Sequence, residues 1–223
     1  MISTPNPEPL ELTVISERTM DPATAARLRL QFLPKDLTPQ DQPIVYAMAG
    51  IPGSGKSVYV DAAIERGELP RNAYLLDPDR VMMAMPEYID DISMMGAASA
   101  FRHWEIPARL LAYDMAQEAA EKRYHIIQDM GSVRRENLDR LSQFKQRGYR
   151  IQMTYVFCPV DEALRRLQTR AGRYTAAAMV KERAASLNLL LPAYVDLCDS
   201  FRVLDNSDPD HPFQETTLDA VMG

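Results

Sequence analysis

One eight-residue stretch, Gly50-Ile-Pro-Gly-Ser-Gly-Lys-Ser57, constrains the fold of this chain more than any other feature. A glycine, four residues and then Gly-Lys-Ser form the phosphate-binding loop pattern, which lies between a buried strand and a helix. The flanks agree with that setting, because an apolar run covers residues 44–49 and a helical pattern of apolar residues follows Ser57. The stretch therefore predicts a strand, a loop and a helix that together bind a nucleoside triphosphate, rather than an incidental glycine-rich turn.

Each residue type in this loop has a physical role in holding phosphate. Gly53 and Gly55 allow backbone conformations that turn successive N–H groups inward around an anion. The helix after the loop adds the positive end of its dipole. We expect Lys56 to reach the β- and γ-phosphates of ATP and Ser57 to place its hydroxyl on Mg²⁺. The residues predicted to bind the nucleotide are Gly50, Pro52, Gly53, Ser54, Gly55, Lys56, Ser57 and Val58.

Two further apolar runs end in aspartate. Residues 73–76 lead directly into Asp77-Pro-Asp-Arg80, and residues 124–128 lead into Asp129. Ligands of open parallel sheets bind at the carboxyl ends of the strands, so these carboxylates are candidates for a site. Beside a phosphate loop, one carboxylate can take a proton from an acceptor hydroxyl and another can support Mg²⁺. The structural alternatives are an ordinary helix cap for the first pair and a strand-end turn for Asp129.

Strands and helices alternate along the chain. The expected strands cover residues 44–49, 73–76, 124–129, 151–157 and 201–205. This order predicts a doubly wound α/β fold of the phosphate-loop kinase type, with a mainly parallel five-stranded sheet flanked by helices. We expect residues 1–40 to form an N-terminal arm with one short helix at 22–32, and residues 41–223 to form the phosphate-loop domain. The arm is interpreted as a packing strap in preference to an interaction segment.

Prolines set several of the expected helix limits. We expect one helix to run from Pro107 to Lys122, with Leu110, Leu111, Met115 and Ala119 on one face. Another helix is expected to cover residues 176–191 and to end before Pro192. Residues 86–93 are expected to form a loop, and the proline-rich residues 1–9 to be disordered or loosely packed.

Composition argues against several classes of protein. The net charge of −6 and the lack of a basic block argue against a nucleic-acid partner. No apolar stretch approaches the roughly 20 residues that span a membrane, and the N-terminus lacks the layout of a secretion signal. The two cysteines, Cys158 and Cys198, have no metal-binding spacing, so reduced thiols in the cytoplasm are the simplest interpretation.

Further motifs extend over about residues 40–207. Besides the phosphate loop they are Leu76-Asp-Pro-Asp-Arg80, Pro86-Glu-Tyr88, Phe101-Arg-His-Trp-Glu-Ile-Pro107, Gly148-Tyr149, Pro159 with the helix to Arg170, Gly172-Arg173 and Leu204-Asp-Asn-Ser207. With these motifs the chain resembles the zeta-toxin family of phosphate-loop kinases. Many families share the loop. The Asp-Pro-Asp-Arg element and the arginine pair Arg170 and Arg173 make the resemblance specific to this family.

The resemblance implies an ATP- and Mg²⁺-dependent phosphotransferase that acts on a sugar hydroxyl, the family's best-known acceptor being UDP-N-acetylglucosamine. It implies that Asp79 accepts the proton, and that Arg170 and Arg173 stabilise the transferring group together with Lys56. For a toxin it also implies a neutralising antitoxin protein. The residues implied to contact the acceptor are Asp77, Arg80, His103, Glu105, Asp129 and Arg134, and those implied to hold the metal are Ser57 and Asp129.

Three departures from the family pattern lie on the acceptor side. The turn after the third strand is Asp129-Met-Gly-Ser-Val-Arg134, without the usual threonine, and no proline closely follows Arg173. The carboxylate expected on the helix near residue 110 is either Asp114 or Glu118. The alternatives therefore remain a kinase of another small acceptor, such as NAD, a nucleoside or an antibiotic, or a non-catalytic ATP-binding module. A GTPase is disfavoured, because no Asn-Lys-x-Asp element is present.

Overall fold

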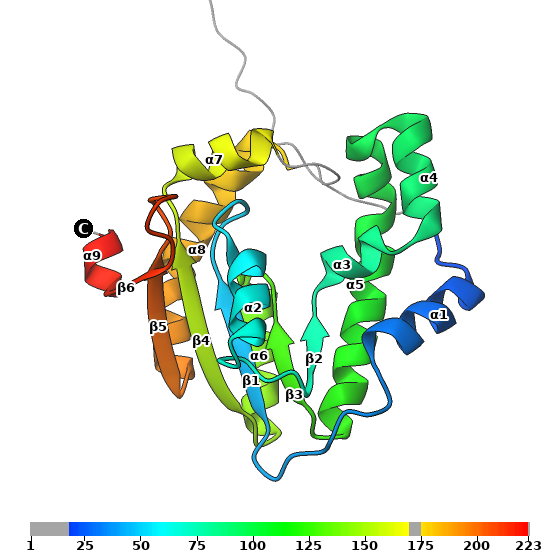
Figure 1. The fold of residues 1–223 in the computed structure, drawn as a ribbon, viewed down its shortest axis with the longest axis horizontal. Helices are drawn as coiled ribbons and strands as arrows, with labels where there is room; N and C mark the ends of the chain where they lie inside the picture. The colour runs from blue at the N-terminus through cyan, green and yellow to red at the C-terminus, as the bar shows by residue number, and fades with distance from the viewer. Residues whose placement is uncertain (1–17, 170–174, 223) are drawn as a thin grey trace, which may run out of the picture.

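The computed structural model describes residues 18–169 and 175–222. Within them, six strands form one sheet in the order β2-β3-β1-β4-β5-β6 (Figure 1). The strands are β1 (Ile44–Ala49), β2 (Ala73–Leu76), β3 (His125–Gln128), β4 (Arg150–Phe157), β5 (Ser200–Asp205) and β6 (Gln214–Thr216). All neighbouring pairs are parallel except β5 and β6, which are antiparallel. The predicted doubly wound α/β fold is confirmed. The predicted count of five strands is wrong, because the polar tail adds β6 at the edge of β5.

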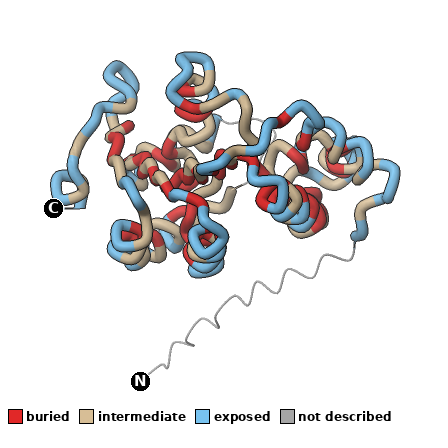
Figure 2. The backbone as a smooth tube through the Cα atoms, turned by 90° about the horizontal axis from the view of Figure 1, so that it is seen from below, coloured by how far each residue is buried: buried red, intermediate tan, exposed pale blue. Residues whose placement is uncertain are grey.

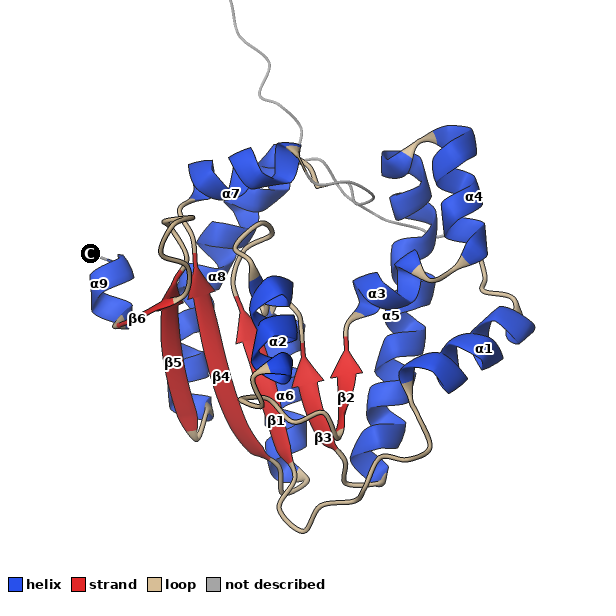
Figure 3. Cartoon of the chain, in the orientation of Figure 1, coloured by secondary structure: helices blue, strands red, loops and turns tan. Residues whose placement is uncertain are grey.

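Helices connect the parallel strands and cover both faces of the sheet (Figure 3). They are α1 (Pro22–Phe32), α2 (Lys56–Glu65), α3 (Pro78–Met83), α4 (Pro86–Met95), α5 (Ala97–Glu121), α6 (Arg135–Gln146), α7 (Val160–Gln168), α8 (Ala177–Leu197) and α9 (Leu218–Met222). Helix α2 packs on one face, α6 and α8 pack on the other, and α5 packs beside β2 and β3. Helix α7 rises beyond the carboxyl ends of the strands, on the opposite side of the sheet's upper edge from α4.

The alternation of side chains along each strand divides the core between the two faces. On β1, Val45 and Ala47 belong to the larger cluster with α5, α6 and α8, whereas Met48 packs with α2. On β3, Ile126 and Ile127 divide in the same way. Buried residues accordingly gather along the strands and the inner helix faces (Figure 2). Burial on both faces explains why the strands appear in the sequence as apolar runs.

Two helix limits that were predicted at prolines are wrong, and so is one predicted loop. Helix α5 begins ten residues before Pro107, and α8 continues past Pro192 to Leu197. Proline in a helix interior removes a hydrogen bond and costs about 3 kcal/mol. Here packing offsets that cost, because Phe101 and Trp104 are buried in the first turns of α5. Residues 86–95 form α4 instead of a loop, with Pro86 at the first helical position.

Helix α1 is tied to the helices that follow β2. Asp21 caps it, with Oδ2 accepting hydrogen bonds from the backbone N–H groups of residues 23 and 24, as expected from the sequence. The Thr24 hydroxyl donates to Glu87 on α4 at 2.6 Å, and Arg29 pairs with both Asp114 and Glu118 on α5. These contacts support the interpretation of α1 as a packing strap. Residues 1–9, which were expected to be loosely packed, lie outside the described residues.

Tyr74 offers a test of how β2 is joined to α5. Its ring is fully buried, and its hydroxyl donates to the carbonyl oxygen of Ala112 at 2.8 Å. Tyr74→Phe removes this bond and leaves the packing unchanged, so we expect the free energy of unfolding to fall by about 1 kcal/mol. The measurement is urea unfolding, in which the midpoint should fall and the slope should stay constant. An unchanged midpoint would show that the bond contributes nothing.

Candidate active site

A cavity of about 920 Å³ opens at the carboxyl ends of the parallel strands. Its wall is formed by the phosphate loop, α3, α5, the segment after β3, α6, α7, α8 and the connection between β5 and β6. Ligands of open α/β sheets bind at this edge. Of the eight residues predicted to bind nucleotide, Pro52, Gly53, Gly55, Lys56, Ser57 and Val58 line the cavity. Gly50 and Ser54 are buried in the loop and do not line the cavity.

The loop has the backbone conformation that its glycines predict. Gly53 has a φ angle of +86° and Gly55 has +96°, both in the region that side chains disfavour. A Cβ atom on Gly53 would lie 2.6 Å from the carbonyl oxygen of Ala163 on α7, so this position has no room for a side chain. Lys56 begins α2, and its Nζ donates to the carbonyl oxygen of Ile51 at 2.8 Å. The ammonium group is therefore held over the loop that would surround phosphate.

Asn206 and Arg166 fix the outer side of the loop. The Asn206 side chain donates to the carbonyl oxygen of Ser54 at 2.8 Å. Arg166 on α7 donates to the carbonyl oxygen of Asn206 at 2.9 Å and to Glu162 at 2.7 Å. Arg166 and Asn206 also line the cavity. One connected set of bonds thus places the Arg166 guanidinium group beside the phosphate loop.

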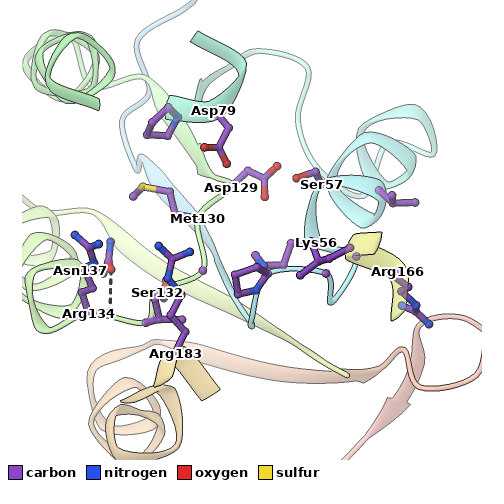
Figure 4. A pocket seen from close by; sticks show the side chains of 18 of the residues that line it. Lys56, Ser57, Asp79, Asp129, Met130, Ser132, Arg134, Asn137, Arg166 and Arg183 are labelled. Carbon is purple, nitrogen blue, oxygen red and sulfur yellow. Dashed lines mark hydrogen bonds between the residues drawn. The ribbon is translucent and has the colours of Figure 1, made fainter. Parts of the chain in front are cut away.

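Three oxygen-bearing side chains meet at the head of the cavity. Figure 4 shows Asp79 of α3, Asp129 at the end of β3 and Ser57 of α2 pointing toward one another. Burial raises the pKa of the Asp129 carboxyl above its ordinary range, while Ser57, Lys56 and Arg80 act in the opposite sense. Neither carboxylate oxygen of Asp129 has a hydrogen-bond partner of ordinary geometry. A buried carboxylate of this kind is costly unless a cation completes it.

This arrangement fits Mg²⁺. A hydroxyl and a carboxylate beside bound phosphate are the oxygen donors through which Mg²⁺ is held in kinases, with water filling its other positions. Ser57 and Asp129 would hold the ion, which would supply positive charge to the phosphate oxygens. No group of three or more histidine, cysteine, aspartate or glutamate side chains suited to a metal occurs in residues 18–169 and 175–222. A site completed by substrate and water agrees with that finding.

Asp77 is a helix cap, which is the structural alternative that the sequence left open for it. Its carboxylate accepts hydrogen bonds from the backbone N–H groups of Asp79 and Arg80, and it pairs with the Arg80 guanidinium at 2.9 Å. Burial raises the pKa of Asp77, and the nearby Asp129 and Asp79 raise it further. Asp77 therefore caps α3 and presents Asp79 to the cavity. Of the other residues implied to contact the acceptor, Glu105, Asp129 and Arg134 line the cavity, whereas Asp77, Arg80 and His103 are not part of its wall.

Neither proposed carboxylate of α5 reaches the cavity. Asp114 and Glu118 both pair with Arg29 of α1, and Glu118 also binds Lys122. Glu105 is the α5 carboxylate that lines the cavity, paired with Arg109. The predicted arginines Arg170 and Arg173 lie outside the described residues. Cavity residues that the sequence did not single out include Arg109, Tyr113, Asn137, Arg140 and Arg183, whereas Asn206 belongs to the Leu204–Ser207 motif.

Comparison with known proteins identifies one family. A family model described as zeta toxin matches residues 31–216. Among solved structures, one from the PezAT chromosomal toxin-antitoxin system of Streptococcus pneumoniae is similar over 92% of this chain and 87% of its own, with a TM-score of 0.66 and 12% identity. A second, AvrRxo1-ORF1:-ORF2 with ATP, is similar over 87% of this chain and 63% of its own, with a TM-score of 0.57 and 14% identity. At these identities the structures show a shared fold.

Curated protein sequences give no match to the chain. In the part of the chain that the structure describes, no helix combines the length and apolarity needed to cross a membrane.

Gly53→Ala tests the geometry of the phosphate loop. The new Cβ would clash with the carbonyl of Ala163, so we expect nucleotide affinity to fall by at least about tenfold because the loop must move. Gly67→Ala is the matched control: its φ of +76° is also positive, but nothing lies within 4 Å of the new Cβ. Titration of Mg-ATP by calorimetry compares the two. Equal affinities would contradict a role for the close approach at Gly53.

Asp129→Asn tests the cost of the buried carboxylate. Because its folded-state pKa is raised above the ordinary value of 3.8, the folded protein keeps a proton that the unfolded chain releases, and stability falls as pH rises above about 4. Without Mg²⁺, the variant should melt at a higher temperature than the parent at pH 7.5 and depend less on pH. Asp90→Asn, on the exposed side of α4, controls for loss of a surface charge. A parent-like pH profile for Asp129→Asn would refute the assignment.

Proposed function

Since the chain belongs to the zeta toxin family, we propose that it is a kinase that transfers the γ-phosphoryl group of Mg-ATP to a hydroxyl of a small molecule. The observation that carries this proposal is the convergence of Lys56, Ser57, Asp79 and Asp129 on one cavity. A nucleotide switch or binding module needs the phosphate loop alone. A carboxylate beside the loop, in a cavity that continues to α5 and α6, is what group transfer to a second ligand requires.

The proposed roles follow from position and charge. Lys56 neutralises phosphate oxygens from its place over the loop. Asp79 is held at the start of α3 by the Asp77 cap, and it orients or deprotonates the acceptor hydroxyl. Arg166 sits at the nucleotide side, fixed by Glu162 and Asn206. Arg170 and Arg173 complete the proposal as the residues that stabilise the charge spreading over the transferring group.

The acceptor is proposed to be a nucleotide sugar, with UDP-N-acetylglucosamine as the first candidate from the family resemblance. NAD, a nucleoside or an antibiotic is the alternative class. The cavity of about 920 Å³ is large enough for ATP and a second ligand of this size. A non-catalytic ATP-binding module would need no proton acceptor at the head of the cavity, so Asp79 favours the kinase.

A protein partner is also part of the proposal. Two solved structures with a similar fold come from a toxin-antitoxin system and from a complex of two open-reading-frame products. We propose that this chain, if it acts as a toxin, is neutralised by an antitoxin in the cytoplasm. A test is co-purification with the product of an adjacent reading frame, with loss of ATP binding in the complex.

The deciding experiment is phosphate transfer from Mg-ATP to a panel of UDP-sugars, NAD, nucleosides and aminoglycosides, followed by mass spectrometry. We expect a gain of one phosphate on a single class of acceptor. Asp79→Asn should lower turnover by about 10²- to 10⁴-fold, the usual contribution of a general base, and should leave ATP affinity within a few fold.

The controls separate catalysis from folding. Asp90→Asn, on the exposed side of α4, should keep full activity. Full turnover in Asp79→Asn would remove Asp79 from the mechanism. ATP binding without transfer to any acceptor would favour the non-catalytic module.

A further inference from the structure

Arg80 joins helices α2 and α3. Its Nε donates to Oδ2 of Asp77 at 2.9 Å, and its Nη2 donates to Oδ1 of Asp61 at 2.6 Å. Asp77 caps α3, whereas Asp61 lies in the second turn of α2. One guanidinium group therefore bridges the helix that begins at the phosphate loop and the helix that carries Asp79.

This bridge lies one helical turn behind the head of the cavity. Ser57 and Asp61 are four positions apart, so they share one face of α2. Ser57 points toward Asp79 (Figure 4), and Asp61 binds Arg80, the residue that follows Asp79. Neither Asp61 nor Arg80 lines the cavity. The pair therefore connects α2 and α3 outside the space that the two substrates would fill.

The guanidinium group makes the bridge rigid. Its N–H donors lie in one plane at fixed angles, so two carboxylates bound to different edges are held at a set separation. The Asp77 end is buried, with 6% of the side chain exposed, and its Oδ1 already accepts from the backbone N–H groups of Asp79 and Arg80. This end of the bridge cannot shift without disturbing the start of α3.

The Asp61 end is open to solvent. The side chains of Arg80 and Asp61 are 35% and 55% exposed, and ion pairs as open as this one contribute little to the free energy of unfolding. Catalysis depends more steeply on position, because displacement of a reacting group by about 1 Å can lower the rate about 100-fold. A bond that sets the separation of two helices can therefore control turnover while it hardly changes stability.

We propose that Arg80 is a positioning residue, which bridges Asp61 and Asp77 and thereby sets the distance between the phosphate held by α2 and the acceptor hydroxyl held by Asp79. The inference rests on the proposed kinase function and adds to it a pair, Asp61 and Arg80, that touches neither substrate. Arg80 was implied to contact the acceptor, but it lies outside the cavity wall and acts instead through α3.

Asp61→Asn tests the bridge from its exposed end. The variant removes the charge that Arg80 binds and leaves the cavity wall unchanged. With the acceptor that the parent phosphorylates, we expect kcat to fall at least about fivefold, because the reacting groups are no longer held at the productive distance. The KM values for ATP and the acceptor should stay unchanged, and so should the melting temperature. Glu65→Gln is the matched control, since it removes an exposed carboxylate from the same helix and should keep the parent kcat.

Further variants separate charge from geometry. Asp61→Glu keeps a carboxylate at the same position and should restore most of the parent kcat. Arg80→Lys keeps the positive charge, but one ammonium group cannot hold two carboxylates in a fixed plane, so its kcat should fall as in Asp61→Asn. The double variant Asp61→Asn/Arg80→Lys should be no slower than the slower single variant, because both changes break one bridge. Two losses that multiply as independent effects would overturn the proposal.

Amide hydrogen exchange of the free protein reports on the bridge without any ligand. We expect Asp61→Asn to speed exchange in α3 about two- to fivefold, because the bridge no longer holds this short helix, while α6 exchanges as in the parent. Glu65→Gln should exchange like the parent in both helices. Unchanged exchange of α3 in Asp61→Asn would overturn the proposal.

Failure of this inference can be told apart from failure of the kinase proposal. If the parent phosphorylates no acceptor, the kinase and the positioning role fail together, whereas faster α3 exchange in Asp61→Asn still shows that the bridge orders α3. If the parent is an active kinase and Asp61→Asn exchanges faster in α3 with an unchanged kcat, the bridge is structural and the positioning role alone is refuted. A raised ATP KM with an unchanged kcat would also contradict it, because the pair would then act in nucleotide binding.

Discussion

The fastening of the phosphate loop to the strands on either side of it is the constraint on which the site depends. The backbone N–H of Gly50 donates to the carbonyl of Gly131, and the Ser132 hydroxyl donates to the carbonyl of Met48 at 2.6 Å. Asn206 holds the other side through Ser54. These bonds join the ends of β1, β3 and β5. They fix the loop, the Asp129 segment and the β5–β6 connection as one unit, which is the preorganisation that electrostatic catalysis requires.

A strained backbone conformation and buried carboxylates both occur near the phosphate loop. Ser132 has a φ angle of +53°, an unusual conformation for a residue with a side chain, and Tyr194 of α8 secures it by donating to its carbonyl oxygen. Asp77 and Asp129 are buried carboxylates with raised pKa values. Asp77 is compensated by Arg80, whereas the buried carboxylate of Asp129 weakens the free protein and would become favourable beside a cation. The proposed metal site would therefore trade stability of the free protein for binding of the ion.

The sequence predicts the parts of this structure that local chemistry determines. The glycines of the loop, the Asp21 cap of α1 and the apolar parallel strands each follow from residue type and spacing. The misses have non-local causes. Pro107 and Pro192 are tolerated inside helices because tertiary packing outweighs propensity, and β6 forms because the edge of β5 offers a partner. The sequence could not predict the contact of Arg140 with the Tyr113 ring, since Tyr113 is 27 positions away and on another helix.

The true length of α5 explains which of its residues face the cavity and which face α1. At about 100° per residue, Glu105, Arg109 and Tyr113 recur every four positions and form one stripe, whereas Asp114 lies about 180° from Glu105. The structure follows this geometry, with the stripe on the cavity and Asp114 on Arg29 of α1. A helix start at Pro107 hides the pattern, because it leaves Glu105 outside the helix. Helix α1 and the cavity therefore lie against opposite faces of α5, and α1 supports the cavity wall without lining the cavity.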